Sequence, residues 1–257
     1  MKKLLLIIFS IFIFNLPLSA NEQTLIILDA SSSMNYAYKG ESIFYYAQSA
    51  VNEILNSYNN ENEIGLRLIG MGENDDIFNL FVNFKDMCEK SDLRIPISSQ
   101  SKSRISMSVN DIIPIGISTP LEYSLKEAIT NDFSLSAKIK HIILVTDGGE
   151  NCGGDPCRYI KEIRKTRKDI LIDIIAINPS SDDMPLFNCL ADTTGGKFIP
   201  INSFDAIKPA VSQIFRNTTS IKNSIVKSLP SPELKTKNLK FDKRNVVYKK
   251  YLLEFTE

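Results

Sequence analysis

The chain has 257 residues, of which 43% are hydrophobic, with 30 acidic side chains, 30 basic side chains and a formal net charge of zero. This length and apolar content suit one domain with a modest appendage. The balanced charge argues against binding to nucleic acid or to an anionic membrane surface, both of which need a basic excess.

The first twenty residues, MKKLLLIIFSIFIFNLPLSA, are typical of a secretory signal peptide. Lys2 and Lys3 precede an apolar run, Pro17 interrupts it, and small residues lead to a cleavage site after Ala20. An uncleaved membrane anchor is the alternative, but the run is short for a span of about 20 residues. No later segment of the sequence approaches that length. We therefore expect a secreted or periplasmic protein without a stable membrane span after cleavage.

Strands and helices are predicted to alternate in the first half of the mature chain. QTLIILD is a continuous apolar run, which is typical of a strand buried on both faces. An acidic and aromatic insertion at 71–90 includes FNLFVNF (78–84), which could form a short strand. The other elements predicted here are strands at 23–29, 63–70 and 91–97, the last an edge strand, and helices at 40–58 and 101–112.

The alternation continues in the second half. Thr119 and Pro120 predict a helix start at 119–132, because Thr is a good N-cap and Pro loses no hydrogen bond in a first turn. Pro209 lies inside the last predicted helix and puts its rigidity in doubt. The other elements predicted here are strands at 140–149, 170–178 and 197–201, and helices at 156–169, 184–196 and 204–217.

This alternation predicts an α/β fold with an open, mostly parallel, doubly wound sheet of Rossmann-like type. One antiparallel edge strand and helices on both faces complete it. Residues 221–257 are rich in lysine, and we expect a linker followed by an extra strand, a partner-binding segment or a flexible tail.

Four cysteines in an exported chain favour two disulfides. Zinc at CGGDPC is the alternative, but it lacks a second cysteine pair, and the only histidine, His141, opens a predicted strand. Right-handed crossovers would place the helices of Cys157 and Cys189 side by side, which favours Cys157–Cys189 and leaves Cys88–Cys152. A local Cys152–Cys157 bridge with Cys88–Cys189 stays open as the rival pairing.

Oxygen-bearing side chains follow two central predicted strands. Asp29 and Asp147 each end one of these strands, and ligands of open parallel sheets bind beyond the carboxyl ends of the strands. Neighbouring carboxylates repel each other unless a cation lies between them. Ser31, Ser33 and Thr119 add hydroxyl groups, and such hard oxygen ligands suit Mg²⁺, or else Mn²⁺ or Ca²⁺.

In this combination the residues resemble the metal-ion-dependent adhesion site of von Willebrand factor type A domains. That site has the pattern Asp-x-Ser-x-Ser, a distant Thr and a distant Asp at a strand end. Asp29, Ser31 and Ser33 match the first element, Thr119 in GISTPL the second, and Asp147 in LVTDGGE the third. The segment TDGGENCGGDPC, together with the early cysteine, is similar to a secreted bacterial branch of the family.

The resemblance implies a domain at 21–220, between the signal peptide at 1–20 and the extension at 221–257. It implies that the three hydroxyls contact the cation and that the two aspartates hold it directly or through water. An Asp or Glu of a partner protein would fill the open position. Glu150 and Asp155 are predicted to be rim charges rather than further ligands.

The implied function is an exported protein-binding module that is not an enzyme. A scaffold subunit of an envelope complex, in which the metal is structural, is the alternative. A metal-dependent hydrolase is disfavoured, because the sequence offers no Ser-His-Asp or Cys-His arrangement near the site and no phosphate-binding loop.

Overall fold

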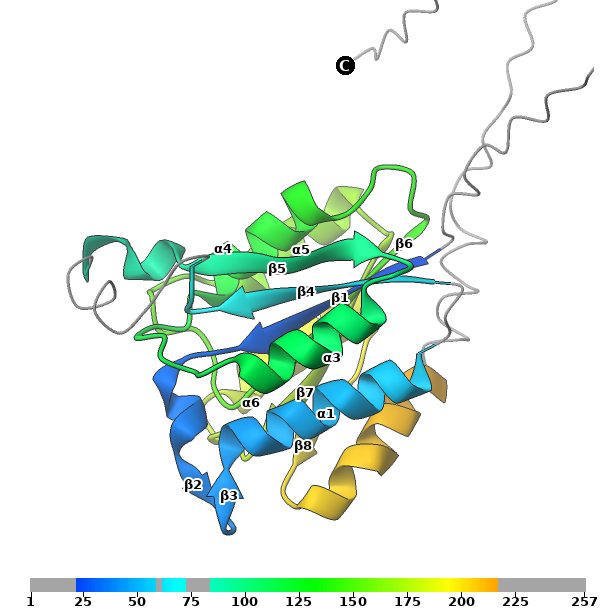
Figure 1. Ribbon diagram of the computed structural model, residues 1–257. Coiled ribbons are helices and arrows are strands. Elements are labelled where there is room, and N and C mark those ends of the chain that lie inside the picture. Colours follow the sequence, from blue (N-terminus) through cyan, green and yellow to red (C-terminus); the bar gives the residue numbers. More distant parts are fainter. Residues whose placement is uncertain (1–21, 59–61, 73–83, 217–257) are drawn as a thin grey trace, which may run out of the picture.

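The computed structural model describes residues 22–58, 62–72 and 84–216, and a six-stranded sheet forms its centre (Figure 1). The strand order is β5-β4-β1-β6-β7-β8, with β5 antiparallel to β4 and every other neighbouring pair parallel. This confirms the predicted sheet with its one antiparallel edge strand. The strands are β1 Glu22–Asp29, β4 Glu63–Ile69, β5 Ser91–Ser98, β6 Ile139–Thr146, β7 Ile170–Ile177 and β8 Phe198–Ile201.

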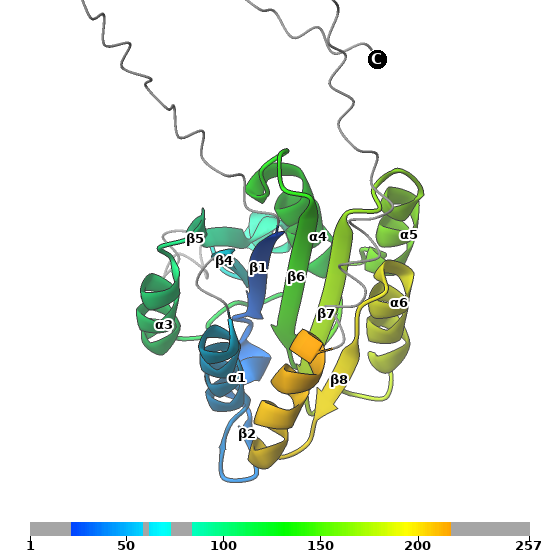
Figure 2. The same ribbon diagram turned by 90° about the vertical axis from the view of Figure 1, so that its right-hand side faces the viewer.

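Helices cover both faces of the sheet (Figure 2). One face packs against α1, α3 and a helix at 207–216, and the other packs against α4, α5 and α6. A π-helical turn, Ala128–Asp132, continues α4. The named helices are α1 Ile43–Ser57, α3 Lys102–Asp111, α4 Leu121–Glu127, α5 Pro156–Thr166 and α6 Met184–Thr194.

The apolar run of β1 explains its place in the middle of the sheet. Successive side chains of a strand point to opposite faces. Ile26 and Leu28 therefore enter the core under α1, while Leu25 and Ile27 enter the core under α4 and α6, and all four side chains are fully buried. A strand of this kind is stable only where helices cover both of its faces.

The helix predicted at 40–58 begins three residues later, because a small hairpin precedes it. Lys39 and Gly40 form its turn with positive φ angles of 49° and 95°. Ser42 then caps the helix, since its hydroxyl accepts a hydrogen bond from the amide of Tyr45 at 3.1 Å. The hairpin strands are β2 Ala37–Tyr38 and β3 Glu41–Ser42.

The prediction that Thr119 caps a helix is wrong. Pro120 occupies the cap position of α4 and no side chain of the cap residue bonds to the helix. Glu150, from a distant loop, instead accepts a hydrogen bond from the amide of Glu122 at 2.8 Å. The Thr119 side chain is therefore not used for capping.

The last helix contains Pro209, as predicted, but the proline does not break it. A 3-10 turn, Phe204–Ala206, comes first, and the α-helix starts at residue 207. Pro209 thus lies in the first turn, where a missing amide hydrogen leaves no bond unmade.

Three predictions lie outside the described residues: the signal peptide at 1–20, the extension at 221–257, and nearly all of the short strand at 78–84, whose last residue begins the 3-10 helix Phe84–Glu89. Within the ranges that are described, no helix has the length and apolarity needed to cross a bilayer.

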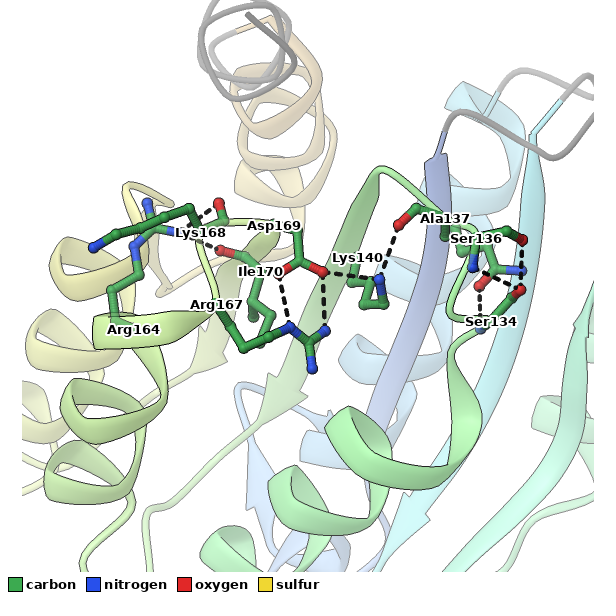
Figure 3. A network of polar contacts seen from close by, with 10 residues as sticks. Ser134, Ser136, Ala137, Lys140, Arg164, Arg167, Lys168, Asp169 and Ile170 are labelled. Carbon is green, nitrogen blue, oxygen red and sulfur yellow. Dashed lines mark hydrogen bonds and ion pairs between the residues drawn. The ribbon is translucent and has the colours of Figure 1, made fainter. Parts of the chain in front are cut away.

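A polar network lies at the amino ends of β6 and β7 (Figure 3). The Lys140 ammonium, which is buried, bonds to the carbonyl of Ala137 and to Asp169, both at 2.8 Å. Arg167 donates two further hydrogen bonds to Asp169, at 2.8 and 2.9 Å. Burial by itself raises the pKa of Asp169, but the hydrogen bonds from Arg167 and Lys140 outweigh it and lower this pKa to about 2.

The single histidine belongs to the core. His141 Nε2 lies 2.6 Å from Asp173 Oδ2, and both side chains are fully buried between β6 and β7. The alternative of a zinc site has no support, because all four cysteines are paired in disulfides.

Candidate metal centre

Asp29 stands at the carboxyl end of β1 with its side chain fully buried. The amide of Ser31 donates to Oδ1 at 2.8 Å, and the Thr146 hydroxyl donates to Oδ2 at 2.6 Å. Burial raises the pKa of Asp29, and the hydrogen bonds from Thr146 and Ser31 oppose part of this rise. The two bonds fix the orientation of a carboxylate that is expensive to keep charged without a cation.

The two serines connect the ends of β1 and β6. Ser31 Oγ and Ser33 Oγ lie 3.0 Å apart, and Ser33 Oγ donates to Asp147 Oδ1 at 3.0 Å. The segment after Ser31 is a short 3-10 helix, Ser32–Asn35. Met34 anchors this turn, since its side chain is fully buried in the core.

Asp147 follows β6, which is hydrogen-bonded to β1 as the prediction requires. Burial, and then the charge of Asp29, raise the pKa of Asp147 from 3.8 to about 6. The bond from Ser33 opposes this rise, and the charge of Asp183 adds to it. The Asp147 carboxylate is thus destabilised as an anion at neutral pH in the absence of a cation.

The loop that carries Thr119 crosses the end of β1. Gly116 pairs with Ser31 in an isolated parallel bridge, and its carbonyl accepts a hydrogen bond from Ser32 at 2.6 Å. A Cβ atom at Gly116 would lie 2.5 Å from the carbonyl oxygen of Gly70, so a glycine is needed for this close passage. Three residues later in the same loop, Thr119 is buried.

A second loop, after β6, holds Thr119 from the other side. The Thr119 amide donates to Asn151 Oδ1 at 2.6 Å, and the Asn151 amide donates to the Thr119 carbonyl at 3.4 Å. Asn151 follows Asp147 by four residues. The five predicted ligand residues therefore belong to three loops that are bonded to one another at one edge of the sheet.

The chemistry of this cluster fits a hard divalent cation. Two carboxylates lie close enough for the charge of one to raise the pKa of the other, and hydroxyl groups bridge them. In the part of the chain that the structure describes, no group of three or more His, Cys, Asp and Glu side chains is arranged to hold a metal ion. The predicted set has three hydroxyls and two carboxylates, and such oxygen ligands suit magnesium or manganese better than a soft metal.

Two acidic residues that were considered as rim charges have structural partners. Glu150 accepts from the amides of Glu122 at 2.8 Å and Cys152 at 2.6 Å. Asp155 caps α5 by accepting from the amide of Arg158 at 2.9 Å. Both carboxylates thus shape the loop between β6 and α5.

Sequence reasoning missed two residues that support the cluster. Thr146 bonds to Asp29, and register could have revealed it, since Leu28 pairs with Val145 and the next residues of both strands are therefore opposite. Asp183 accepts from the amide of Gly149 at 3.0 Å. It comes from the loop after β7, and no local signal points to it.

Two disulfides lie near this end of the sheet. The structure joins Cys88 to Cys152, with a Cα separation of 5.5 Å, and Cys157 to Cys189, with a Cα separation of 5.8 Å. The first links the 3-10 helix before β5 to the loop after β6, and the second links α5 to α6. The rival pairing with a local Cys152–Cys157 bridge is not the one formed here.

Solved structures resemble this fold at low sequence identity. A structure of proximal thread matrix protein 1 from the mussel byssus, described with a zinc-occupied MIDAS motif, is 17% identical with a TM-score of 0.57, covering 77% of this chain and 48% of that one. A von Willebrand factor type A structure from Catenulispora acidiphila is 19% identical with a TM-score of 0.55, covering 76% and 42%. These likenesses establish the fold alone.

Sequence relatives occur in Bacillus subtilis (strain 168). "Uncharacterized protein YwmC" is 28% identical over 176 residues, which cover 68% of this chain and 74% of the relative. "Uncharacterized protein YwmD" is 25% identical over 192 residues, which cover 74% and 84%. The family model described as "von Willebrand factor type A domain" matches residues 25–217, and domains of this kind are in general non-enzymatic modules for protein interaction. The chain therefore belongs to the von Willebrand factor type A domain family.

Proposed function

We propose that this protein is an exported, metal-dependent protein-binding module. A divalent cation, Mg²⁺ or else Mn²⁺ or Ca²⁺, is held by the hydroxyls of Ser31, Ser33 and Thr119 and by the carboxylates of Asp29 and Asp147. When bound, the cation supplies a positive charge that a carboxylate of a partner protein can contact. The observation that carries the proposal is the bonded series Asp29, Ser31, Ser33 and Asp147 across the ends of β1 and β6.

The chain's own residues prepare this site before any partner arrives. Thr146 and the Ser31 amide hold both oxygens of Asp29, so its position does not depend on the cation. Ser33 orients Asp147 in the same way. A preorganised ligand set loses little entropy when the cation binds, which favours affinity.

Apolar side chains surround the first metal loop and indicate the kind of partner surface that fits. Tyr36 is 69% exposed, Ile113 is 68% exposed and Ile117 is 37% exposed. Asn35 bonds to the carbonyl of Pro114, which brings Tyr36 and Ile113 into neighbouring segments. The partner's Asp or Glu would accordingly be flanked by apolar residues. Burial of these residues adds binding free energy, because a carboxylate that remains exposed to water contributes little on its own.

Export is supported by the two disulfides, which persist in oxidising compartments, and by the signal-like residues 1–20. We place the protein outside the cytoplasm, secreted or periplasmic. The proposed domain is 21–220, with 221–257 as a linker or partner-binding extension.

A hydrolytic role is disfavoured. His141 is fully buried against Asp173, near the amino end of β6, and it cannot act as a base at Asp147 beyond the carboxyl end of the same strand. A scaffold role with a structural cation is the second candidate, because the same loops link β1, β6 and α4.

Calorimetric titration of the chelator-treated protein with Mg²⁺, Mn²⁺, Ca²⁺ and Zn²⁺ tests the site. We expect Asp29→Asn to abolish binding and Asp182→Asn, at an exposed aspartate after β7, to leave it unchanged. Unchanged magnesium affinity in Asp29→Asn would refute the ligand assignment.

Partner capture on the immobilised protein in magnesium, with elution by chelator, separates the two candidate roles. An adhesion module releases its partner when the cation is removed, while its own fold persists in circular dichroism. A scaffold with a structural cation unfolds when the cation is removed.

A further inference from the structure

Thr119 is held in place by its backbone. Its amide and its carbonyl both bond to Asn151, at 2.6 and 3.4 Å, and its side chain does not cap α4. A hydroxyl that must meet a cation needs a backbone fixed to a fraction of an ångström. Asn151 is the residue that supplies this restraint on the side of the β6–α5 loop.

The residue before Thr119 is also held by a hydrogen bond. The Ser118 hydroxyl donates to the carbonyl of Met87 at 2.6 Å. Met87 is followed by Cys88, and Asn151 is followed by Cys152, and these two cysteines form a disulfide. Ser118 and Thr119 are therefore each bonded to one of two segments that the disulfide joins, although its two cysteines are 64 residues apart in sequence.

We name this arrangement the Thr119 clamp: Met87, Cys88, Asn151 and Cys152. Cys88 and Asn151 are exposed, and the disulfide lines a surface pocket with Tyr123 and Lys126. Little buried apolar area therefore holds the clamp closed. A covalent link between two exposed loops restricts them far more than packing does, because it removes most of their independent conformations.

The other disulfide provides an internal comparison. Cys157 lies in the first turn of α5 and Cys189 lies in α6, and both helices pack on one face of the sheet. Neither helix is bonded to Thr119 in the described part of the chain. Removing this link loosens a helix pair and leaves the three metal loops tied.

We propose that Asn151 and the Cys88–Cys152 disulfide are positioning elements for Thr119 and set the affinity of the cation site. This inference rests on the proposed function and deepens it. The disulfide acts on the loop that carries Thr119, whereas β1 and β6 themselves position the loops of the other predicted ligands. Opening it frees the β6–α5 loop from the 3-10 helix before β5 and lets the Thr119 hydroxyl leave the cation.

Two pairs of variants of the full-length chain test the clamp. Cys88→Ser with Cys152→Ser opens it, and Cys157→Ser with Cys189→Ser is the matched control. Asn151→Ala removes the acceptor for the Thr119 amide, and Asn151→Asp keeps an oxygen in its place. The serine substitutions at the clamp are tolerable because Cys88 is exposed and Cys152 is half-buried.

The two readouts are magnesium affinity by calorimetry and hydrogen exchange of the Thr119 amide without metal. We expect the clamp-opening pair and Asn151→Ala to weaken magnesium binding about tenfold or more, as the loss of groups that orient metal ligands typically does, and to speed exchange at Thr119. In the control pair and in Asn151→Asp, the magnesium affinity and the exchange rate of the Thr119 amide should stay near the wild-type values.

The outcomes separate this inference from the proposed function. Absence of magnesium binding by the wild-type protein overturns the proposed function, and the clamp falls with it. Binding by the wild type together with unchanged affinity and unchanged Thr119 exchange in Asn151→Ala overturns the clamp alone. Equal losses in both disulfide pairs also overturn it, since the effect then reflects general loosening of the domain.

Discussion

Replacing Asp147 by asparagine should stabilise the metal-free protein at neutral pH, although it removes a proposed ligand. Burial and the charge of Asp29 raise the pKa of Asp147 from 3.8 to about 6. The ionised carboxylate is thus disfavoured in the folded state. This penalty is absent below about pH 4, grows as the pH rises towards 6 and is complete above 6.

The size of the effect follows from the shift. A difference of about 2 pKa units corresponds to about 3 kcal/mol at about 1.4 kcal/mol per unit. Because Asp147 is only half-buried, solvent screening reduces this to about 1–3 kcal/mol. For a domain of this size, the melting temperature should shift by about 2–4 °C for each kcal/mol of unfolding free energy.

The assay compares wild type and Asp147→Asn by thermal and urea unfolding at pH 7.5, in chelator and in magnesium. In chelator the variant should be the more stable protein. In magnesium the difference in stability between the two proteins should become smaller or change sign, because the bound cation stabilises only the wild type by mass action. A variant that is less stable in chelator, or that gains as much from magnesium as the wild type, would refute the reasoning.

Three further predictions follow from other residues. Thr119→Ala should weaken magnesium binding and destabilise the fold by about 1 kcal/mol, from the buried methyl group that it removes. No cap is lost, because Pro120 and not Thr119 is the cap residue. Thr119→Ser should retain magnesium binding, and calorimetry with urea unfolding checks both variants. Asp169, whose pKa is lowered to about 2, should contribute up to about 2.5 kcal/mol of stability that is present above pH 4 and lost as the pH falls towards 2. Acid unfolding of Asp169→Asn should lack this part of the pH dependence, and an unaltered acid midpoint would contradict it. Tyr36→Ser with Ile113→Ser should weaken partner capture without changing magnesium affinity, and an equal loss of both would show that the loop itself had been disturbed.

The strands and their alternation with helices could be predicted, because a strand that is buried on both faces consists of consecutive apolar residues. Within 23–29, the four residues 25–28 are all apolar, and Asp29 ends the run abruptly. The acids at the strand ends were found for the same reason, as abrupt breaks in apolar runs. Neighbouring strands then brought Asp29 and Asp147 to one edge.

Local signals failed where distant residues decided the outcome. Thr119 followed by Pro120 has the chemistry of a helix start, yet Glu150 bonds to the first turn of the helix from a loop 28 residues away. The hairpin before α1 was missed although Gly40 is suited to its turn, because two-residue strands carry almost no periodicity and Lys39 is not a typical residue for a positive φ angle. Asn151 could not be identified, since its role arises only from two loops that meet in space.

The position of Asp29 also determines how the domain bears mechanical load. β1 is hydrogen-bonded to β4 from Gln23 to Asp29 and to β6 from Glu22 to Leu28. A partner that pulled on a cation at Asp29, against an anchor at the other end of the strand, would load both ladders in shear. Every hydrogen bond would then resist the force at once, whereas a sideways pull would open them one by one. The central strand should therefore offer its highest resistance to a pull along its own axis.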